Sequence, residues 1–196
     1  MQKHIDNIEK VYHLPTVVTL NKYESDTNKE IELVKNLLKP TKVVINEVWA
    51  KGGDGARELA QEVLKKCNET NENFEYAYDL NDSVENKIRC VVKKIYGGKD
   101  IFLTDKAKDK IKLVKKLGYD KFPVIIAKTQ FSLSDDAKLL GAPTDFDVTV
   151  RDIEIKSGAK FLVVICGKIL LMPGLSKTPA AVKMKIDNDG IVDGLF

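Results

Sequence analysis

The sequence predicts an α/β fold with a mixed, largely parallel β-sheet whose strands are joined by helical crossovers. Short apolar runs rich in Val and Ile alternate along most of the chain with amphipathic segments of helical length. Beyond Ala142 this alternation stops, and residues 145–172 have the pattern of consecutive strands with a turn at Ser157 and Gly158. We therefore expect an α/β region followed by a C-terminal α+β subdomain that ends in a strand-rich segment.

The first part of the chain alternates strand and helix patterns. Thr27 and Glu30 have the spacing of a capping box, so a helix should begin there, and Pro40 should stop it. In order, the expected elements are strand Pro15–Asn21, a helix after Thr27, strand Lys42–Trp49, a glycine-rich run, and helix Ala56–Cys67 with Leu59, Val63 and Leu64 on one face.

The alternation continues in the middle of the chain. The expected elements are strand Phe74–Leu80, helix Ser83–Gly97, strand Asp100–Thr104, helix Lys106–Gly118 and strand Phe122–Lys128. A change of subdomain is expected between Leu80 and Asp100, although no linker rich in Pro, Gly or Ser marks it. We divide the chain into residues 1–85 and residues 86–196.

Composition excludes several classes of protein. The chain has 196 residues, of which 43% are hydrophobic and 31% are charged, with a net charge of +3 from scattered charges of both signs. Such mixed charges are typical of solvated helix faces, so we expect no nucleic-acid partner. No apolar run has membrane-spanning length, and the start of the chain has no signal-peptide pattern. The three cysteines have no CxxC spacing, which fits a reducing cytoplasm and suggests neither disulfides nor zinc.

The only tryptophan, Trp49, stands before a run with three glycines in four positions. There a strand leads through a loop to a helix N-terminus, whose free N–H groups can hold an anion. The glycines, among them Gly52 and Gly53, would let a ligand approach the backbone closely, and Trp49 could present its face to a planar ring. Asp54 would act as a cap and repel a phosphate. The alternative is a buried core tryptophan followed by a turn.

A second group of polar residues follows the first expected strand. Asn21, Lys22 and Tyr23 stand at its carboxyl end, where open α/β sheets bind ligands. Tyr23 and Trp49 could clamp a flat ligand between two rings. The alternative for Tyr23 is a half-exposed surface residue without a role.

A third group follows the strand that ends at Lys128. Polar side chains at this position suit an anion or an amide-bearing ring, and the alternative is a Ser- and Asp-rich turn that caps the next segment. The group consists of Lys128, Thr129, Gln130, Ser132 and Ser134.

Other chemistry leaves no pattern in the sequence. No GxxxxGK[ST] phosphate-binding loop occurs, since Cys166–Ile169 lacks both its first glycine and its hydroxyl residue. The two histidines, His4 and His13, pair with no Ser, Cys or metal-ligand cluster. The sequence therefore predicts no metal site, and it does not identify the catalytic residues.

Four motifs taken together resemble the formate–tetrahydrofolate ligase family. They are EVWAKGGDG, AKTQFSLSDDAKLLGAP, TVRDI and the terminal MPGLSKTPAAVKMKIDNDGIVDGLF, and the resemblance runs from about His4 to Phe196. It covers the C-terminal third of a longer protein and leaves out the N-terminal part with the ATP-binding P-loop. It implies that the α/β region is a P-loop NTPase-like remnant.

The resemblance also implies an activity in one-carbon metabolism. ATP, with Mg²⁺, would phosphorylate formate, and the N10 amine of tetrahydrofolate would attack the formyl phosphate to give 10-formyltetrahydrofolate. It further implies a cytoplasmic homotetramer. The reaction needs charge neutralisation around the phosphoryl group and a platform that orients the pterin. The absent N-terminal part should supply the first of these, and this chain the second.

The family's ring slot carries over to Tyr23 and Trp49, which would stack the pterin or the adenine. Lys51, Gly52 and Gly53 then become loop residues beside the ligand. The family commonly has Phe-Pro where this chain has Tyr23 and Glu24, and proline where this chain has Ser176. Two alternatives to an enzyme part stay open: a folate- or nucleotide-binding module without turnover, and a scaffold.

Overall fold

The computed structural model describes residues 1–69, 73–169 and 177–194. Its helical elements are α1 (Gln2–Asp6), η1 (Asn7–Val11), α2 (Asn28–Leu37), α3 (Val48–Lys51), η2 (Gly52–Ala56), α4 (Arg57–Cys67), α5 (Val84–Cys90), η3 (Val91–Tyr96), α6 (Asp105–Lys116) and η4 (Ala180–Val182). Its strands are β1 (Val18–Asn21), β2 (Val43–Asn46), β3 (Asp100–Leu103), β4 (Val124–Ala127), β5 (Asp147–Lys156), β6 (Phe161–Cys166), β7 (Lys185–Ile186) and β8 (Val192–Asp193).

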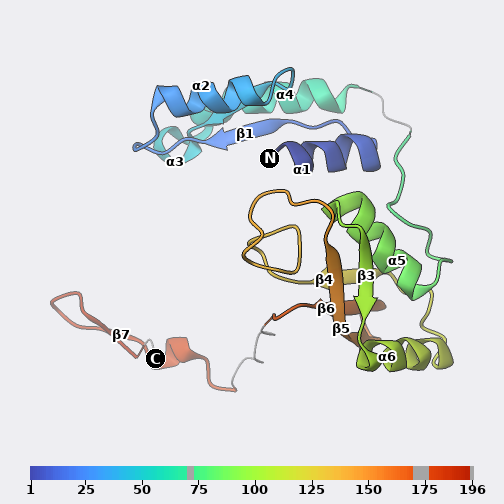
Figure 1. Cartoon of the computed structure of the whole chain (residues 1–196). Coiled ribbons are helices and arrows are strands. Elements are labelled where there is room, and N and C mark those ends of the chain that lie inside the picture. The colour runs from blue at the N-terminus through green and yellow to red at the C-terminus, as the bar shows by residue number, and fades with distance from the viewer. Residues whose placement is uncertain (70–72, 170–176, 195–196) are drawn as a thin grey trace.

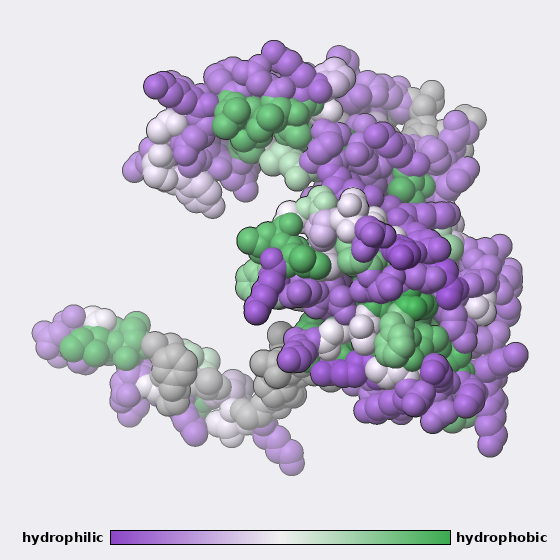
Figure 2. Space-filling model, viewed as in Figure 1, coloured by the Kyte–Doolittle hydropathy of each residue, from purple (hydrophilic) through white to green (hydrophobic). Residues whose placement is uncertain are grey.

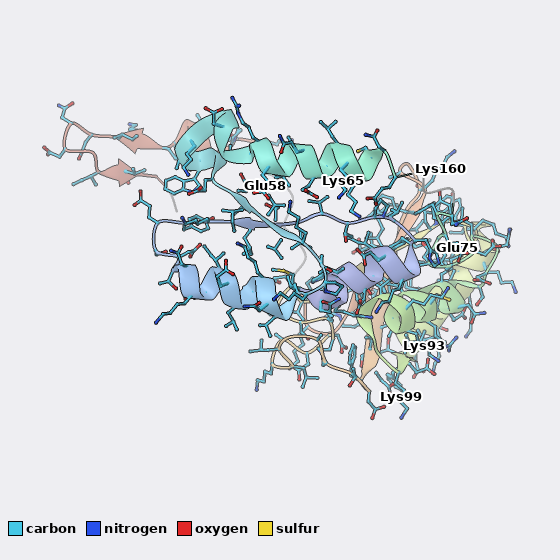
Figure 3. All side chains as sticks on the ribbon, turned by 90° about the horizontal axis from the view of Figure 1, so that it is seen from above. Glu58, Lys65, Glu75, Lys93, Lys99 and Lys160 are labelled. Atoms are coloured by element: carbon cyan, nitrogen blue, oxygen red, sulfur yellow. The ribbon has the colours of Figure 1, made fainter. Side chains whose placement is uncertain are left out.

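A small layer is formed by the parallel strands β1 and β2 together with α2 and α4 (Figure 1), and the view from above shows the strands running between the two helices (Figure 3). Its buried core consists of Ile5, Val18, Leu38 and Val43. Neither α2 nor α4 has a fully buried residue. This layer therefore keeps much apolar surface outside its own core.

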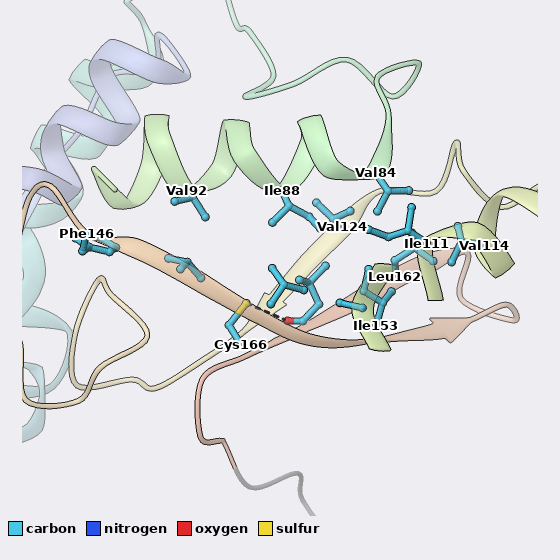
Figure 4. Packing of buried hydrophobic residues seen from close by; sticks show 14 residues of the cluster. Val84, Ile88, Val92, Ile111, Val114, Val124, Phe146, Ile153, Leu162 and Cys166 are labelled. Atoms are coloured by element: carbon cyan, nitrogen blue, oxygen red, sulfur yellow. Dashed lines mark hydrogen bonds between the residues drawn. The ribbon is translucent and has the colours of Figure 1, made fainter. Parts of the chain in front are cut away.

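A second sheet has the strand order β3-β5-β6-β4. β3 pairs with β5, and β4 with β6, in parallel, whereas β5 and β6 form an antiparallel hairpin. Figure 4 shows Val84, Ile88 and Val92, from α5 and η3, packed over these strands. The expected mixed, largely parallel α/β architecture is thus confirmed.

Most of the expected elements are present. Thr27 and Glu30 form both hydrogen bonds of the capping box, and the turn at Ser157 joins β5 to β6. In α6, Ile111 and Val114 are buried, whereas Leu113 and, just past the end of the helix, Leu117 are exposed. Lysines cover the outer face of α6, as expected for a solvated helix surface.

The strand expected over Phe74–Leu80 is absent, and this prediction was wrong. Residues 74–80 have no regular secondary structure apart from a bend at Ala77 and Tyr78 and a turn at Leu80, and they join none of the described sheets. The Tyr78 hydroxyl accepts a hydrogen bond from the N–H of Val124 at 3.0 Å, so a side chain occupies the edge of β4 where a strand would have paired. The alternating apolar residues therefore belong to an irregular segment, which contacts β4 through the Tyr78 side chain.

Two further expectations around the glycine run need correction. Strand β2 ends at Asn46, so Trp49 lies on the short helix α3 and not on the strand. Asp54 caps no helix: its carboxylate accepts a hydrogen bond from Arg57 Nε at 2.8 Å, and α4 has no side-chain cap. The Arg57 guanidinium neutralises the carboxylate that was expected to repel a phosphate.

Charged side chains of both signs lie along the helices, as Glu58 and Lys65 on α4 illustrate in Figure 3. One lysine is an exception, because Lys87 on α5 is fully buried. Its Nζ donates to the carbonyl oxygens of Asp120 and Phe122 at 2.6 and 3.1 Å. Burial lowers the pKa of this ammonium group. Lys87 therefore ties α5 to the loop before β4.

The two sheets are joined through the N-terminal helix. Asn7 Nδ2 donates to the carbonyl oxygen of Ile95 at 2.8 Å, and Lys3 Nζ donates to that of Lys94 at 3.3 Å. The division at residues 85 and 86 stays a prediction, and residue 85 lies within α5.

The C-terminal part described is the hairpin of β7 and β8. The family-like segment at residues 172–176, including Ser176, lies outside the described residues. Among the residues that are described, no helix is long and apolar enough to cross a membrane.

Candidate functional site

The indole of Trp49 lies at the carboxyl end of the β1–β2 pair and is 57% exposed. Its Nε1 donates a hydrogen bond to the carbonyl oxygen of Lys22 at 2.7 Å. One edge of the indole is thus fixed to the backbone that follows β1, while more than half of the side chain faces solvent. The alternative of a buried core tryptophan is wrong.

The position of Trp49 follows from Asn46, the last residue of β2. The Asn46 Oδ1 accepts a hydrogen bond from the N–H of Val48 at 3.1 Å, which satisfies a free donor of the first turn of α3. Ala50 and Lys51 donate their N–H groups to the carbonyl oxygen of Glu47 and close this turn. The chain therefore leaves the strand at Asn46 and turns Trp49 back toward β1.

The glycine run is shaped by a close approach of two backbone segments. The N–H of Glu47 donates to the carbonyl oxygen of Gly55 at 3.1 Å. A Cβ at Gly55 would lie 2.5 Å from the carbonyl carbon of Glu47, so only glycine fits there. Gly52 has a φ of +60°, which also favours glycine, whereas a Cβ at Gly53 would meet nothing within 4 Å. Gly53 thus leaves open backbone in the segment that follows α3.

Glu47 lies between two lysines. Its carboxylate is 2.6 Å from Lys51 Nζ and 3.6 Å from Lys22 Nζ. The hydrogen bond from Lys51 is the main cause that lowers the pKa of this carboxyl group. The ionised Glu47 therefore links the segment after β1 to the end of α3.

Asn21 and Tyr23 lie at the same edge. Asn21 is the register partner of Asn46, and the two carboxamides are hydrogen-bonded at 2.8 Å. The Tyr23 ring is 62% exposed, and its backbone is fixed by a turn in which its N–H donates to Asp26 Oδ2. Within the described chain, no ring stacking joins Tyr23 to Trp49. We call Asn21, Tyr23 and Trp49 the ring slot.

The third predicted group lies elsewhere, at the carboxyl end of β4. Lys128 Nζ donates to the carbonyl oxygens of Thr129 and Ser132 and lies 4.9 Å from the centroid of the Tyr96 ring. Burial lowers the pKa of this ammonium group. Its three contacts hold the loop that follows β4.

The two serines of this group are also engaged. Ser132 and Ser134 are buried, and their hydroxyls lie 2.9 Å apart. Ser132 also donates to the carbonyl oxygen of Leu139, and Ser134 donates to that of Asp136. Gln130 alone is exposed, in a pocket of about 880 Å³. The pattern fits the structural alternative better than a binding site.

Two residues of the slot edge, Asn46 and Glu47, were missed by the sequence analysis. Both sit inside the run expected as one long strand, where nothing in the sequence marks them as different from ladder residues. The available signal was the Asn at the carboxyl end of each of two neighbouring strands, Asn21 and Asn46, which parallel pairing brings side by side.

The described residues do not suit a magnesium ion. No three side chains among the described His, Cys, Asp and Glu converge in a way that could hold a metal. At the slot edge, Glu47 is already paired with two lysines, and Asp26 accepts a hydrogen bond from the N–H of Tyr23. The carboxylates near the slot are therefore not arranged as metal ligands.

Fold and site together define an α/β protein with exposed aromatic side chains at the carboxyl edge of a parallel strand pair. Comparison with known proteins specifies it further. The chain belongs to the formate–tetrahydrofolate ligase family, whose model matches residues 1–196. It is 48% identical over 201 residues to the formate–tetrahydrofolate ligase of Psychrobacter sp. (strain PRwf-1). This alignment covers 100% of the chain but 35% of that relative, so the chain spans about a third of its length.

Proposed function

We propose that this chain is the C-terminal part of an ATP-dependent formate–tetrahydrofolate ligase and that it supplies the ring slot. The observation that carries the proposal is the Trp49 indole, 57% exposed yet fixed by its N–H to the Lys22 carbonyl oxygen at 2.7 Å. An exposed aromatic ring held in one orientation loses little conformational entropy when a flat ligand stacks on it. Tyr23 provides a second ring at the same edge.

The glycine run supports the same role. Gly53 has open space where a side chain would be, and Gly52 adopts a φ that favours glycine. A ligand stacked on Trp49 can therefore approach this backbone. Lys51 precedes the two glycines, and its ammonium group forms an ion pair with the Glu47 carboxylate, so the two charges neutralise each other.

The rest of the reaction is assigned to the remaining part of the enzyme. ATP would phosphorylate formate there, next to Mg²⁺ and a P-loop, with release of ADP. The amine of tetrahydrofolate would then attack the carbon of formyl phosphate, and the C–O bond to phosphate would break with release of inorganic phosphate. This chain's contribution is to orient the pterin, which raises the rate by holding the amine at the acyl carbon. The two sheets would be a P-loop NTPase-like remnant and a C-terminal subdomain, within a cytoplasmic homo-oligomer.

Two other roles predict different behaviour. A stand-alone binding module would hold the folate or nucleotide ring without turnover, even when the N-terminal part is added. A scaffold would bind neither ligand. Turnover that requires both parts separates the enzyme from the module, and ligand binding by this chain separates both from the scaffold.

Calorimetric titration with tetrahydrofolate tests the proposal. Trp49→Ala should abolish binding, and Tyr23→Ala should weaken it roughly tenfold, because a stacked ring contributes about 1–3 kcal/mol. Phe102→Ala is the matched control, since this phenylalanine is 61% exposed on β3 and lies on the other sheet. Equal affinity of Trp49→Ala and the wild-type chain would exclude Trp49 as the platform.

A further inference from the structure

The residues of the ring slot are joined by a closed circuit of hydrogen bonds. The carbonyl oxygen of Asn46 accepts from the N–H of Lys22 at 3.0 Å, and the carbonyl oxygen of Lys22 accepts from Trp49 Nε1 at 2.7 Å. Trp49 lies on α3, whose Val48 N–H returns to Asn46 Oδ1 at 3.1 Å. Asn46 is therefore the point where both strands and the helix meet.

This circuit fixes which way the Asn46 carboxamide faces. A backbone N–H can only donate, so the atom that faces Val48 must be the carbonyl oxygen of Asn46. Its NH₂ group then faces Asn21 across the strand pair, and Asn21 must present its own carbonyl oxygen, at 2.8 Å. The orientation of one carboxamide thus determines the orientation of the other.

These orientations determine which group Asn21 presents to solvent. With its oxygen bound to Asn46, Asn21 directs its NH₂ group away from the strand pair, where it has no protein partner among the described residues. Asn21 is exposed, and residues two apart in an extended segment project to the same side. The rim of the slot beside Tyr23 therefore carries a hydrogen-bond donor.

We propose that Asn46 is a positioning residue that orients Asn21, and that Asn21 selects flat heterocycles with a hydrogen-bond acceptor at their rim. The inference rests on the proposed function of the slot, and it adds that the rim of the slot carries a hydrogen-bond donor. A ring carbonyl oxygen or an unprotonated ring nitrogen fits such a donor. The pterin of tetrahydrofolate and the adenine of ATP both offer one, so the test uses both ligands separately.

The test compares variants that remove or invert the donor. Asn21→Ala removes it. Asn46→Asp keeps an oxygen for the Val48 N–H but offers Asn21 a second oxygen, so Asn21 turns round and presents its carbonyl oxygen outward. Each variant should bind tetrahydrofolate or ATP about five- to tenfold more weakly in calorimetry, the loss expected for one hydrogen bond. The ligand whose affinity falls in these variants is the one that accepts a hydrogen bond from Asn21.

The control for the added charge is Ser25→Asp. Ser25 is exposed in the same loop, outside the circuit, and this variant should bind within about twofold of wild type. A readout without ligand comes from exchange of the side-chain amide protons in NMR. In the wild type the Asn46 amide protons should exchange more slowly than those of Asn21, and in Asn46→Asp the Asn21 amide protons should exchange more slowly than they do in the wild type.

The outcomes separate this inference from the proposed function. If Trp49→Ala loses binding while Asn21→Ala binds as tightly as wild type, the slot stands and the role of Asn21 is overturned. If the Asn21 amide protons are already the slower ones in the wild type, the assigned orientation is wrong, whatever the chain binds. If the wild-type chain binds neither ligand, the proposed function is overturned, and the selection of ring ligands by Asn21 is overturned with it.

Discussion

Single residues at the slot edge are constrained by backbone contacts more than by side-chain packing. Trp49 and Tyr23 are both exposed, yet their positions depend on Lys22 and Asn46, whose main-chain groups hold the two segments together. Gly55 lies against the same turn, with its carbonyl oxygen on the N–H of Glu47. Small changes in this backbone should therefore move the indole.

Gly55→Ala should destabilise the chain by about 1–3 kcal/mol and shift the emission of Trp49. Its Cβ would lie 2.5 Å from the carbonyl carbon and oxygen of Glu47, so α3 must move. Gly53→Ala is the matched control, because its Cβ would meet nothing within 4 Å. Thermal unfolding and emission spectra of both variants measure the effect. Equal melting temperatures would show that the loop adapts without moving α3.

Lys87 shows how one buried residue can hold a loop. Lys87→Met should lower the free energy of unfolding by roughly 1–3 kcal/mol, since the carbonyl oxygens of Asp120 and Phe122 would stay buried without their donor. Lys93→Met, an exposed site in the same helical run, should change it little. Urea unfolding of both variants provides the comparison. A stabilised Lys87→Met would mean that burial of the charge costs more than its hydrogen bonds contribute.

At the scale of elements, the parts predicted correctly are those with strong local signals. The capping box of α2, the helix α6 and the turn between β5 and β6 were all predicted from neighbouring residues. The failed strand at Phe74–Leu80 has the right alternation, but pairing depends on what lies at the edge of β4, and there a Tyr78 hydroxyl takes the place of a strand. Helix α3 was missed because its start depends on Asn46, which looks like a strand residue.

The ring slot was predictable only in part. Tyr23 and Trp49 were singled out, but the position of the Trp49 indole depends on its hydrogen bond to the Lys22 carbonyl oxygen, which no residue type reveals. The buried serines Ser132 and Ser134 were given a binding role because their hydroxyls are polar. Their partners are backbone groups of the same loop, which only the folded chain brings near.

Thr27→Ala should lower the free energy of unfolding by about 1 kcal/mol, because it removes the N-cap of α2, and Thr27→Ser should largely restore it.

The backbone hydrogen bond from Thr27, followed by the one from its hydroxyl, lowers the pKa of Glu30 from 4.5. The ionised Glu30 therefore stabilises the fold above that value, and the contribution is lost as the pH falls through the lowered pKa.

The pH dependence of the cap is testable with Glu30→Gln. Its difference in unfolding free energy from wild type should be largest near neutral pH and should shrink as the pH falls from 4.5 through the lowered pKa of Glu30. Urea unfolding across this range measures it. A difference that stays constant down to pH 2 would rule out the ionised carboxylate as the stabilising form.

For the whole molecule, both the chain's length and its exposed apolar surface indicate contact with another protein surface. It spans 35% of the length of its relative, and α2 leaves Leu33 and Leu37 58% and 70% exposed. Figure 2 shows apolar surface over this helix. Residues four apart share one helix face, so the two leucines form a continuous stripe. Exposed stripes of this kind usually contact another protein surface.

The double variant Leu33→Lys and Leu37→Lys should reduce self-association of the isolated chain and its binding of a hydrophobic dye. Sedimentation velocity and dye fluorescence measure the two effects. Asn36→Lys adds a charge to the same helix at an exposed polar position and is the control. If the double variant associates as strongly as the control, the stripe on α2 is not the contact surface.

The central claim is that this chain alone holds the ring of tetrahydrofolate on Trp49. Because the chain has one tryptophan, titration of its fluorescence with tetrahydrofolate reports on that side chain alone. We predict a saturable change, corrected for absorption by the ligand, that Asn21→Ala shifts to higher concentration. A fluorescence that does not change with either tetrahydrofolate or ATP would contradict the claim.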